Sequence, residues 1–582
     1  MKNKKAAPVV AVIVLVILVV LITLGTKLIQ KYIPSKELQD MNEYYHLSAD
    51  DDMAMVVDDV VLDTTCKYMD GEVYIDYESV HDMFNERFYW DANENVLLYT
   101  LPDNLITVPA GSNTYTIGKD NQTAEYTIVR NDSNTMYMAL DFVEQYTNLT
   151  HTIYENPNRV VITSVWKTVD TATAKKDTQL RLKGGIKSPI LKELTKGDTL
   201  TVLEPGDNWT KVATEDGMIG YLKSKFVSKL TQTERTHAFE EPVFTHMTED
   251  KTIQMAWHQV TTAEANSNVA NVLQNTKGIN VLSPTWFRLT DSNGNIASIA
   301  SSDYVNYCHQ NGVEVWALIN NIDGMDSATA IDTTTSVLTH TSARQNLVNQ
   351  LISAAIQYDL DGINLDFESI SGEVGDGYIQ LIRELSLKCA NNGVVLSVDN
   401  YVPSDYTAFY NRAEQANFAD YVVIMGYDEH TGKDVGSVSS IGFAKDGVAN
   451  TLKEVPAEQI ILGCPFYTKM WAITPKEGVT ADPNAESYDE EQYDISFENL
   501  GMDSVAKRLQ LNGVTASWLD DAGQNFAQYQ QDNTTYKVWV EDAASMDERM
   551  NIMKSNDLAG VSFWKLGFEN SSIWDTIIKY TN

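Results

Sequence analysis

The segment DGINLDFE, residues 361–368, decides the fold of this chain and locates its chemistry. Side chains at every second residue of a strand point to the same side, so Asn364, Asp366 and Glu368 share one face. The carboxylates of Asp366 and Glu368 then lie about 6.5–7 Å apart along the strand. Burying two acids in an apolar interior is costly unless they perform a task. Repulsion between them favours a proton on one, which leaves a carboxylic acid available near neutral pH.

Eight segments of this kind alternate with helical stretches over residues 240–582. They are IQMAWHQV from Ile253, INVLSPTWFRL from Ile279, VEVWALIN from Val313, DGINLDFE from Asp361, VVLSVDNY from Val394, YVVIMGYD from Tyr421, QIILGCPFY from Gln459 and GVSFWKLGF from Gly560. Continuous apolar runs are typical of parallel strands buried on both faces. Eight of them predict an α/β fold, a (β/α)8 TIM barrel, in preference to a doubly wound sheet. Because barrel enzymes hold catalytic groups at the carboxyl ends of strands, Glu368 is the predicted catalytic acid.

A long stretch, residues 469–550, separates the seventh and eighth predicted strands and ends in KVWVEDAASM. Long insertions in barrels usually form a wall of the active-site cleft. We therefore expect this β7–β8 insertion to shape substrate binding.

DGINLDFE resembles the fourth-strand motif D-G-x-D-x-D-x-E of glycoside hydrolase family 18, the chitinases and related N-acetylglucosaminidases. Asp361, Gly362, Asp366 and Glu368 match this motif, and Asn364 stands where the family usually has aspartate. The enzymes of the family that act on spore-cortex peptidoglycan look most similar, because they also tend to carry asparagine there. The segments SPTWFRL and VWVEDA look like that branch too, so the resemblance covers the whole barrel.

In this family the substrate's own N-acetyl oxygen is the nucleophile, and no protein carboxylate attacks the sugar. The resemblance therefore implies Glu368 as the general acid and then as the general base for water. Asp366 would orient the acetamido group and stabilise the positive charge of the cyclic intermediate, while Tyr427 would hydrogen-bond the acetamido oxygen. Substrate-binding roles are implied for Trp564, Met425, Asp428, Asn364 and Asp361. Asn364 cannot accept a proton from Asp366, which leaves the pH optimum and the rate open.

Other polar and aromatic residues of the barrel have an ordinary packing interpretation. Trp564 is implied as the floor under the reacting sugar, and filling the barrel is its alternative role. Core packing is expected for Trp257, Trp286 and Trp316, and His258 reads as a hydrogen-bonded barrel histidine rather than a ligand. The sequence offers no metal-ligand spacing and no phosphate-cradling glycine loop, so neither a metal nor another cofactor is expected.

The amino terminus, residues 1–32, predicts a transmembrane anchor. Lys2, Lys4 and Lys5 precede an uncharged run, Ala6–Thr26, that is long enough to cross the hydrocarbon layer as a helix. A cleavable signal peptide would have a shorter apolar core and an A-x-A-like exit, which the sequence LGT at 24–26 matches poorly. The leading lysines favour a cytoplasmic amino terminus, so the rest of the chain should face outward.

After a polar connector, residues 33–52, residues 53–166 contain a duplicated unit. Its copies begin at Val73 and Met136 and align without gaps, each predicted as a strand, a helix and a second strand. The pair resembles the small α+β stalk domain found at the amino terminus of copper amine oxidases and in many bacterial surface proteins. No copper site is implied, because no histidine cluster accompanies the repeat.

Residues 175–230 change to short strands and turns, with Gly-Asp and Asp-Gly pairs among five predicted strands. The segment resembles a small all-β bacterial SH3-like barrel, in which Trp209 and the Gly220-Tyr221 step stand at recurring positions. Such modules often hold cell-wall peptides or polysaccharide, and many act only as spacers, so both roles stay open.

Charge and cysteine content limit the expected partners. Acidic side chains number 80 against 43 basic ones, and the resulting charge of −37 argues against nucleic-acid binding. The four cysteines are scattered, and three lie in apolar runs that suit buried packing better than a disulfide framework. They are Cys66, Cys308, Cys389 and Cys464.

Together these features predict a membrane-anchored hydrolase of β-linked N-acetylglucosamine glycans at a Gram-positive bacterial surface, with peptidoglycan as the expected substrate. A chitinase, or an endo-β-N-acetylglucosaminidase acting on glycoproteins, is the alternative within the enzyme class. From other classes, a glycan-binding lectin or a structural wall-tethering protein would share this domain order. Glu368, Asp366 and Tyr427 are all present, which favours an enzyme. The sequence leaves exo and endo cleavage equally open.

Overall fold

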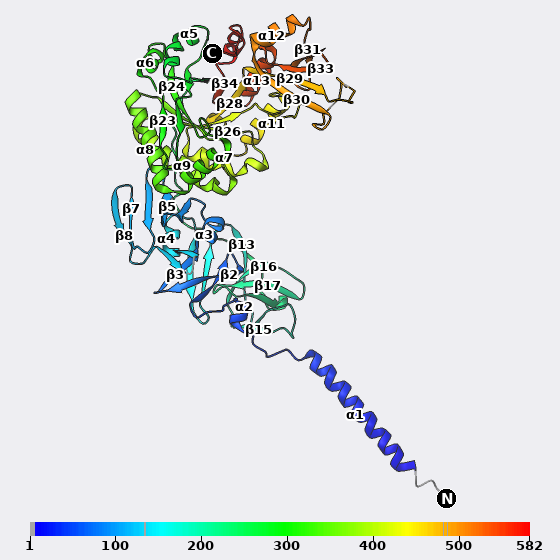
Figure 1. The fold of residues 1–582 in the computed structure, drawn as a ribbon. Coiled ribbons are helices and arrows are strands. Elements are labelled where there is room, and N and C mark those ends of the chain that lie inside the picture. The colour runs from blue at the N-terminus through cyan, green and yellow to red at the C-terminus, as the bar shows by residue number, and fades with distance from the viewer. Residues whose placement is uncertain (1–5, 133–134, 481, 486, 582) are drawn as a thin grey trace. The chain divides into compact units, whose positions relative to one another are not determined.

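Residues 6–132, 135–480, 482–485 and 487–581 are described by a computed structural model of this chain. They form two compact units, whose elements are drawn in Figure 1. The first unit runs to Phe88 and also contains Val108–Tyr115 and Asn121–Glu241, and the second contains Tyr89–Thr107, Thr116–Asp120 and the chain from Pro242 onward. The second unit therefore takes a short piece of chain from the predicted repeat domain.

Eight parallel strands of the second unit close into a barrel, as the apolar runs predict. They are β20 (Ile253–His258), β21 (Val281–Pro284), β24 (Glu314–Asn320), β25 (Gly362–Asp366), β26 (Val395–Tyr401), β27 (Tyr421–Met425), β28 (Ile460–Pro465) and β34 (Gly560–Trp564). Neighbours along the chain pair in parallel, and β34 pairs with both β28 and β20 to close the ring. The predicted TIM barrel is confirmed.

Helices follow the barrel strands and cover the outside of the ring (Figure 1). They are α5 (Val269–Gln274), α6 (Ser302–Gln310), α7 (Ser327–Thr339), α8 (Thr341–Tyr358), α9 (Gly375–Asn392), α10 (Arg412–Phe418), α11 (Ile441–Thr451), α13 (Ala543–Ser555) and α14 (Trp574–Thr581). Apolar residues at helical spacing face the strands. Leu347, Leu351 and Ala355 of α8, for example, are all buried, which fixes the face that α8 presents to the barrel.

The insertion between β28 and β34 is a second, antiparallel sheet with one helix. Its strands are β29 (Tyr467–Pro475), β30 (Tyr493–Gly501), β31 (Ser517–Leu519), β32 (Gln524–Gln531) and β33 (Thr534–Val540), and its helix is α12 (Met502–Leu511). The spatial order of the strands is β30-β29-β33-β32-β31. Because β29 begins two residues after β28 ends, the insertion starts directly at the carboxyl end of a barrel strand.

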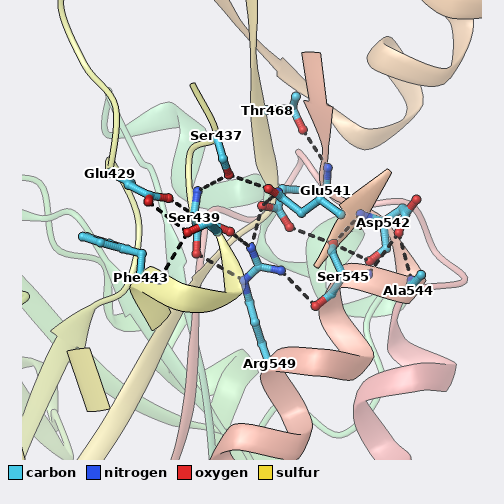
Figure 2. Close-up of polar contacts among 12 residues, drawn as sticks. Glu429, Ser437, Ser439, Phe443, Thr468, Glu541, Asp542, Ala544, Ser545 and Arg549 are labelled. Carbon is cyan, nitrogen blue, oxygen red and sulfur yellow. Dashed lines mark hydrogen bonds and ion pairs between the residues drawn. The ribbon is translucent and has the colours of Figure 1, made fainter. Parts of the chain in front are cut away.

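A buried ion pair fastens the end of the insertion to the barrel (Figure 2). Glu541, just after β33, meets Arg549 of α13 at 2.8 Å, and both side chains are almost fully buried. Gln524 of β32 and Ser545 of α13 also donate to the Glu541 carboxylate, at 2.6 and 2.9 Å. Arg549 donates to the backbone carbonyl of Ser439, in the loop before α11. Burial raises the pKa of Glu541 to about 7, against the opposing effect of Arg549.

The two copies of the repeat fold alike, with one strand more than predicted. Each copy is a strand, a helix and then a hairpin of two strands. The first has β3 (Glu72–Asp76), α3 (Tyr77–Met83), β4 (Phe88–Asp91) and β5 (Val96–Thr100), and the second has β10 (Thr135–Ala139), α4 (Leu140–Gln145), β11 (Thr150–Tyr154) and β12 (Arg159–Thr163). The extra strand forms because each hairpin turns at an asparagine with positive φ, Asn95 (54°) or Asn156 (60°), a residue type that tolerates this backbone.

The hairpin of β4 and β5 supplies α8 with its capping groups. His340 precedes α8 and makes no side-chain capping bond. Instead, Asp91 Oδ2 accepts from the backbone N–H and from the hydroxyl of Thr341, at 2.6 Å each. Glu94 accepts from the backbone N–H of Ser342 at 3.1 Å. Two carboxylates thus stand at the positive end of the helix dipole, where they stabilise the helix.

Three sheets contain the strands that precede the barrel. β3, β10, β11 and β12 join β1 (Asp52–Val57), β2 (Val60–Met69) and β9 (Val129–Asp132) in one seven-stranded sheet, and β6 (Leu105–Pro109), β7 (Thr114–Ile117) and β8 (Asp120–Thr123) follow β5. The SH3-like region is a seven-stranded sheet of β13 (Thr168–Thr173), β14 (Thr178–Arg181), β15 (Ile190–Leu194), β16 (Thr199–Glu204), β17 (Trp209–Thr214), β18 (Ile219–Lys223) and β19 (Thr231–Glu234). Within the connector, α2 (Met41–Tyr44) forms, and Tyr45 is buried against the SH3-like sheet.

The helix α1 (Ala6–Tyr32) coincides with the predicted span. It is long and apolar enough to cross a membrane, and its most apolar stretch is not buried by any other part of the described structure. Lys2, Lys4 and Lys5, on which the predicted orientation depends, lie outside the described residues.

Candidate active site

Two neighbouring strands build the centre of the site. β25 and β26 pair in parallel with Asn364 opposite Ser397. The two-residue period of strands then sets Asp366 beside Asp399 and Glu368 beside Tyr401 on the inner face of the barrel. Three polar pairs therefore rise along the two strands toward their carboxyl ends.

The topmost pair holds Glu368 in place. Tyr401 donates its phenol O–H to Oε2 of Glu368 at 2.7 Å. The backbone of Glu368 is fixed by the Asn321 side chain, which accepts from its N–H and donates to its C=O, both at 2.8 Å. Burial raises the pKa of Glu368. The hydrogen bond from Tyr401 lowers this pKa, whereas the charges of Asp428 and Asp323 raise it further. Because Oε2 accepts from Tyr401, a proton carried by this carboxyl belongs on Oε1.

The middle pair is a second set of acids, of which Asp399 is buried and Asp366 is partly exposed. Burial raises the pKa of Asp366 well above its usual range, and the charges of Asp399 and Glu368 raise it further. Asp399, rather than Glu368, has the larger effect. Oδ1 of Asp366 is buried and has no hydrogen-bond partner among the described residues. The sequence predicted a repelling pair of Asp366 and Glu368, whereas in the structure Asp399 and Asp323 also act on Asp366.

The lowest pair belongs to Asn364, which is fully buried. Its Oδ1 accepts from Trp257 Nε1 at 2.9 Å and from Ser283 Oγ at 3.1 Å. Its Nδ2 donates to Ser397 Oγ at 3.0 Å and to Asp399 Oδ1 at 2.7 Å. Asn364 therefore supports the residues above it and reaches no open part of the cleft.

Aromatic side chains form one wall beside the carboxyls. Trp564 at the end of β34 and Tyr427 just after β27 are both partly exposed, and each meets the buried Trp257 edge-on, with ring centroids 5.8 and 6.4 Å apart. The Tyr427 hydroxyl makes no hydrogen bond within the described part of the chain. Burial raises the pKa of Tyr427 well above its usual range, and the nearby carboxyls of Asp399, Asp366 and Glu368 contribute, so this phenol keeps its proton. Met425 closes β27 and is buried.

The insertion contributes to the far side of this wall. Asp428, whose backbone φ is +60°, exposes about half of its side chain. Its Oδ1 accepts from Tyr467 Oη at 2.7 Å and from Lys469 Nζ at 2.6 Å, and both partners belong to β29. Lys469 is almost fully buried, so the pair fixes Asp428 at the mouth of the barrel.

Asp361 is not brought to this site. It precedes β25, at the opposite end of the barrel from Glu368. Its Oδ2 accepts from the backbone N–H of Val315 at 2.7 Å and contacts His309 Nε2 at 2.8 Å. These contacts explain Asp361 as a residue that fixes the start of a strand, since the carboxylate has no path to a substrate at the carboxyl end.

The packing interpretations of the remaining residues are confirmed. Trp257, Trp286 and Trp316 are buried, and His258 pairs its Nδ1 with the Tyr304 hydroxyl at 2.9 Å. Burial lowers the pKa of His258 to about 4, so the ring is neutral at physiological pH. The four cysteines are free and buried.

Among the described residues of the first unit, Asp141, Glu144 and His151 form a group with metal-ligand chemistry. His151 contacts Glu144 at 2.5 Å through Nδ1 and Asp141 at 3.4 Å through Nε2. Because the three side chains satisfy one another at a partly exposed surface, their arrangement is explained without an ion.

Sequence reasoning missed several residues of the site. Ser397, Asp399 and Tyr401 alternate along VVLSVDNY, and polar residues at every second position of a barrel strand were the available signal. Tyr467 and Lys469 show no comparable signal, because only the path of the insertion brings them to Asp428.

An eight-stranded parallel barrel with a buried acid at the carboxyl end of one strand defines the class of this chain, a barrel glycosidase. Residues 308–569 match the sequence profile of the glycosyl hydrolases family 18. The match covers most of the barrel, as the resemblance of its fourth strand predicted. Residues 176–228 match the bacterial SH3 domain, which confirms the second resemblance.

Known relatives match the barrel half of the chain. An uncharacterized glycosylase of Bacillus subtilis, YvbX, is 26% identical over 298 residues, which are 50% of this chain and 82% of YvbX. The cortical fragment-lytic enzyme of Bacillus anthracis is 24% identical over 277 residues, 46% of this chain and 60% of that enzyme. The crystal structure of a C-terminal domain of a candidate chitinase from Desulfitobacterium hafniense has a TM-score of 0.50 at 16% identity, covering 57% of this chain and 100% of that domain. This structural likeness supports the fold.

Proposed function

We propose that this chain is a membrane-anchored, outward-facing hydrolase that cleaves peptidoglycan at β-linked N-acetylglucosamine by substrate-assisted, retaining catalysis. The observation that carries the proposal is the Glu368 carboxyl, held by Tyr401 at the carboxyl end of β25 beside Asp366. The name of the cortical fragment-lytic relatives and the match to a bacterial SH3 domain support peptidoglycan as the polymer.

Glu368 supplies the proton in the first step. Burial raises its pKa in the direction that a general acid needs, and Oε1 is the oxygen left to carry the proton because Oε2 accepts from Tyr401. Transfer of this proton to the glycosidic oxygen lets the sugar–oxygen bond break. The carboxylate that remains then takes a proton from water, which restores the acid when the intermediate is hydrolysed.

The substrate supplies the nucleophile, its own acetamido oxygen, which closes on the anomeric carbon. Tyr427 has a protonated hydroxyl without a partner in the described structure, and it donates to that oxygen. Asp366, once ionised, stabilises the positive charge of the cyclic intermediate and accepts from the acetamido N–H. The ring of Trp564 forms the apolar floor under the sugar.

The parts before the barrel keep it near its polymer. The helix α1 anchors the chain in the membrane, and the SH3-like sheet holds wall material. A fixed enzyme of this kind meets its insoluble substrate at a high effective concentration.

The test compares the full chain in detergent with its Glu368→Gln variant on purified peptidoglycan and on chitin oligomers. General acid catalysis is typically worth about 10²–10⁴ in rate, so the variant should lose nearly all activity. Glu373→Gln is the matched control, because Glu373 is exposed and lies five residues further along the chain. Product lengths separate exo from endo cleavage. Binding without cleavage by the unaltered chain would instead identify a lectin, and cleavage of chitin alone would identify a chitinase.

A further inference from the structure

Asp366 and Asp399 are two acids side by side on adjacent strands, both inside the barrel. Asp399 is 2% exposed. No lysine or arginine of the described residues bonds either carboxyl. The other charged side chains that affect the pKa of Asp366 or Asp399 are the acids Asp323 and Glu368, while Arg412 acts on the neighbouring phenols Tyr378 and Tyr410. Two full negative charges at this place would be uncompensated, so the pair must retain a proton.

Hydrogen bonds decide which oxygen atoms are left to hold that proton. Trp257 and Ser283 both donate to Oδ1 of Asn364, so the amide nitrogen of Asn364 must face the other way. That nitrogen donates to Oδ1 of Asp399 at 2.7 Å, which makes this oxygen an acceptor. A proton on Asp399 therefore sits on Oδ2. On the other acid, Oδ1 of Asp366 is buried with no partner.

Electrostatics agree with this geometry. Burial raises the pKa of Asp399 to about 8, with Glu368 adding to the effect and the Asn364 amide opposing it. Burial and the charge of Asp399 together raise the pKa of Asp366. The charge of Asp399 thus makes Asp366 harder to ionise, as expected where two neighbouring acids titrate together.

We propose that Asp399 is a positioning residue that shares a single proton with Asp366 and so sets the charge of Asp366 during the reaction. With the proton on Asp366, that carboxyl is neutral and the empty site is stable. With the proton on Asp399 Oδ2, Asp366 is anionic and stabilises the positively charged intermediate. The proton only moves between the two carboxyls, so no other acid or base is required. The catalytic role of Asp399 rests on the proposed function, whereas the existence of the shared proton does not depend on it.

The first experiment detects the proton without any activity. Infrared difference spectra at neutral pH compare Glu368→Gln with Glu368→Gln/Asp399→Asn, which removes the Glu368 acid from both samples. Loss of one protonated-carboxyl C=O band on replacing Asp399 is expected. If no such band is lost, while thermal unfolding shows both variants folded, the shared proton does not exist. This result holds even if the chain cleaves no glycan, an outcome that would contradict only the proposed function.

The second experiment uses kcat and its pH dependence. Asp399→Asn should lower kcat at least about tenfold, which is less than the roughly 10²–10⁴-fold that loss of a general acid itself would cost. It should also shift the acid limb of the profile to lower pH, because removing the Asp399 charge lowers the pKa of Asp366. Adding Asn364→Asp to this variant returns a carboxyl beside Asp366 and should recover part of kcat. An unchanged kcat and profile in Asp399→Asn, or no recovery in the folded double variant, would overturn the positioning role.

A separate observation concerns a pocket of about 390 Å³ next to the catalytic carboxyls, lined by Trp286, Arg288, Asn320, Asp323 and Gly324 among others. Asp323 raises the pKa of both Asp366 and Glu368, which places the pocket next to the reacting groups. The Arg288 guanidinium lies over Gly324, where a Cβ atom would collide with it. Arg288 makes no side-chain hydrogen bond or ion pair with the described residues, although the chain carries a net charge of −37.

We infer that this pocket binds a carboxylate carried by the glycan. A guanidinium binds a carboxylate through two parallel hydrogen bonds. The Arg288 guanidinium has no partner among the described side chains, so it is available to bind a carboxylate of the ligand. Muramic acid and its peptides carry carboxylates, whereas chitin carries none. The inference deepens the proposed function, because it explains how one barrel would select peptidoglycan over chitin.

The test measures binding to the inactive Glu368→Gln chain, so that it does not depend on turnover. Charge-assisted hydrogen bonds contribute about 1.5–3 kcal/mol, so adding Arg288→Gln should weaken binding of muropeptides by about 10- to 100-fold. Binding of chitin oligomers, and of muropeptides with amidated carboxyls, should not change. Lys277→Gln is the control, because Lys277 is an exposed barrel lysine paired with Asp575. Equal weakening for all ligands, or none for muropeptides, would refute the inference.

Discussion

Glu368 is held by a phenol on one oxygen, and this arrangement reflects contacts between residues distant in sequence. Strand periodicity and the family motif were sufficient to predict Glu368, Asp366 and Tyr427 as site residues, and their roles stay predictions. The partners Asp399 and Tyr401 depend on the register between β25 and β26, which the pattern within one strand does not determine. Asn364 was expected to contact the substrate. In the structure its side chain is buried below the carboxyls and makes four hydrogen bonds to neighbouring side chains.

Replacing Tyr401 by phenylalanine should move the alkaline limb of the pH–kcat profile upward. Tyr401 lowers the pKa of Glu368 by donating to its carboxylate, so losing the bond raises that pKa. The acid then remains protonated to higher pH. Tyr406→Phe is a matched control, because Tyr406 is 92% exposed. A limb that stays in place, or moves to lower pH, would contradict the assigned bond.

Among the elements, the barrel strands were the easiest to predict and the insertion the hardest. Eight apolar runs mark strands that are buried on both faces, and β25 to β28 lie within two residues of their predicted starts. The sheet of β29 to β33 has mixed exposure, and its strands pair out of chain order, so no local pattern announces it. The sequence predicted one strand where each repeat has a hairpin of two. A turn marked by a single asparagine looks like an irregular position within one strand.

Arg549→Met should destabilise the barrel more at pH 8 than at pH 5. The folded pKa of Glu541, about 7, lies above its ordinary value of 4.5, so its stabilising contribution is present at low pH and is lost as pH rises through 7. Without Arg549 the buried carboxylate has no counter-charge at pH 8, where a loss of about 3–5 kcal/mol is expected. At pH 5 a proton on Glu541 removes most of this cost. The midpoint of urea unfolding at both pH values measures the difference.

The control for this prediction is Arg508→Met, which breaks the ion pair with Glu498. That pair is largely exposed, so its loss should cost no more than about 1 kcal/mol at either pH. Equal effects of the two substitutions would show that burial of the Glu541–Arg549 pair is unimportant.

The start of α8 provides a second prediction for an element. The double substitution Asp91→Asn/Glu94→Gln removes both charges from the helix start and should destabilise the second unit by about 1–2 kcal/mol. Amide hydrogen exchange at Thr341 and Ser342 should accelerate, since both N–H groups bond these acids. Asp103→Asn, an exposed acid in the same piece of chain, should leave exchange there unchanged. Unchanged protection in the double variant would show that the helix start does not depend on the hairpin.

On the scale of the whole molecule, the order of parts was readable from composition and resemblance. The apolar helix, the repeat, the SH3-like sheet and the barrel follow one another as the sequence predicts, because each has its own hydrophobic pattern. The sequence could not predict that Tyr89–Thr107 belongs to the barrel unit, because this depends on contacts between segments far apart in the chain.

The proposed topology predicts which end of the chain an external protease can reach. In intact cells, a tag at the carboxyl terminus should be digested and a tag at the amino terminus protected, because α1 would cross the membrane once. The substitution Ile17→Lys, near the middle of α1, should cost about 2.5–3.5 kcal/mol of insertion free energy. A fraction of the protein should therefore be released from the membrane. Protection of both tags, or release of the unaltered chain by alkaline washing, would contradict an anchor.

The docked hairpin also bears on how such barrels can be inherited. Tyr89 donates to the Leu338 carbonyl and accepts from the buried Arg344, and Asp91 completes the start of α8. The family's sequence match begins at residue 308 and contains none of these upstream groups. Gene shuffling that moved the barrel alone would remove one hydrogen-bond partner of the buried Arg344, which keeps its ion pair with Glu384, and would uncap a helix. Descendants of this lineage should therefore transmit the repeat and the barrel together, as one unit of selection.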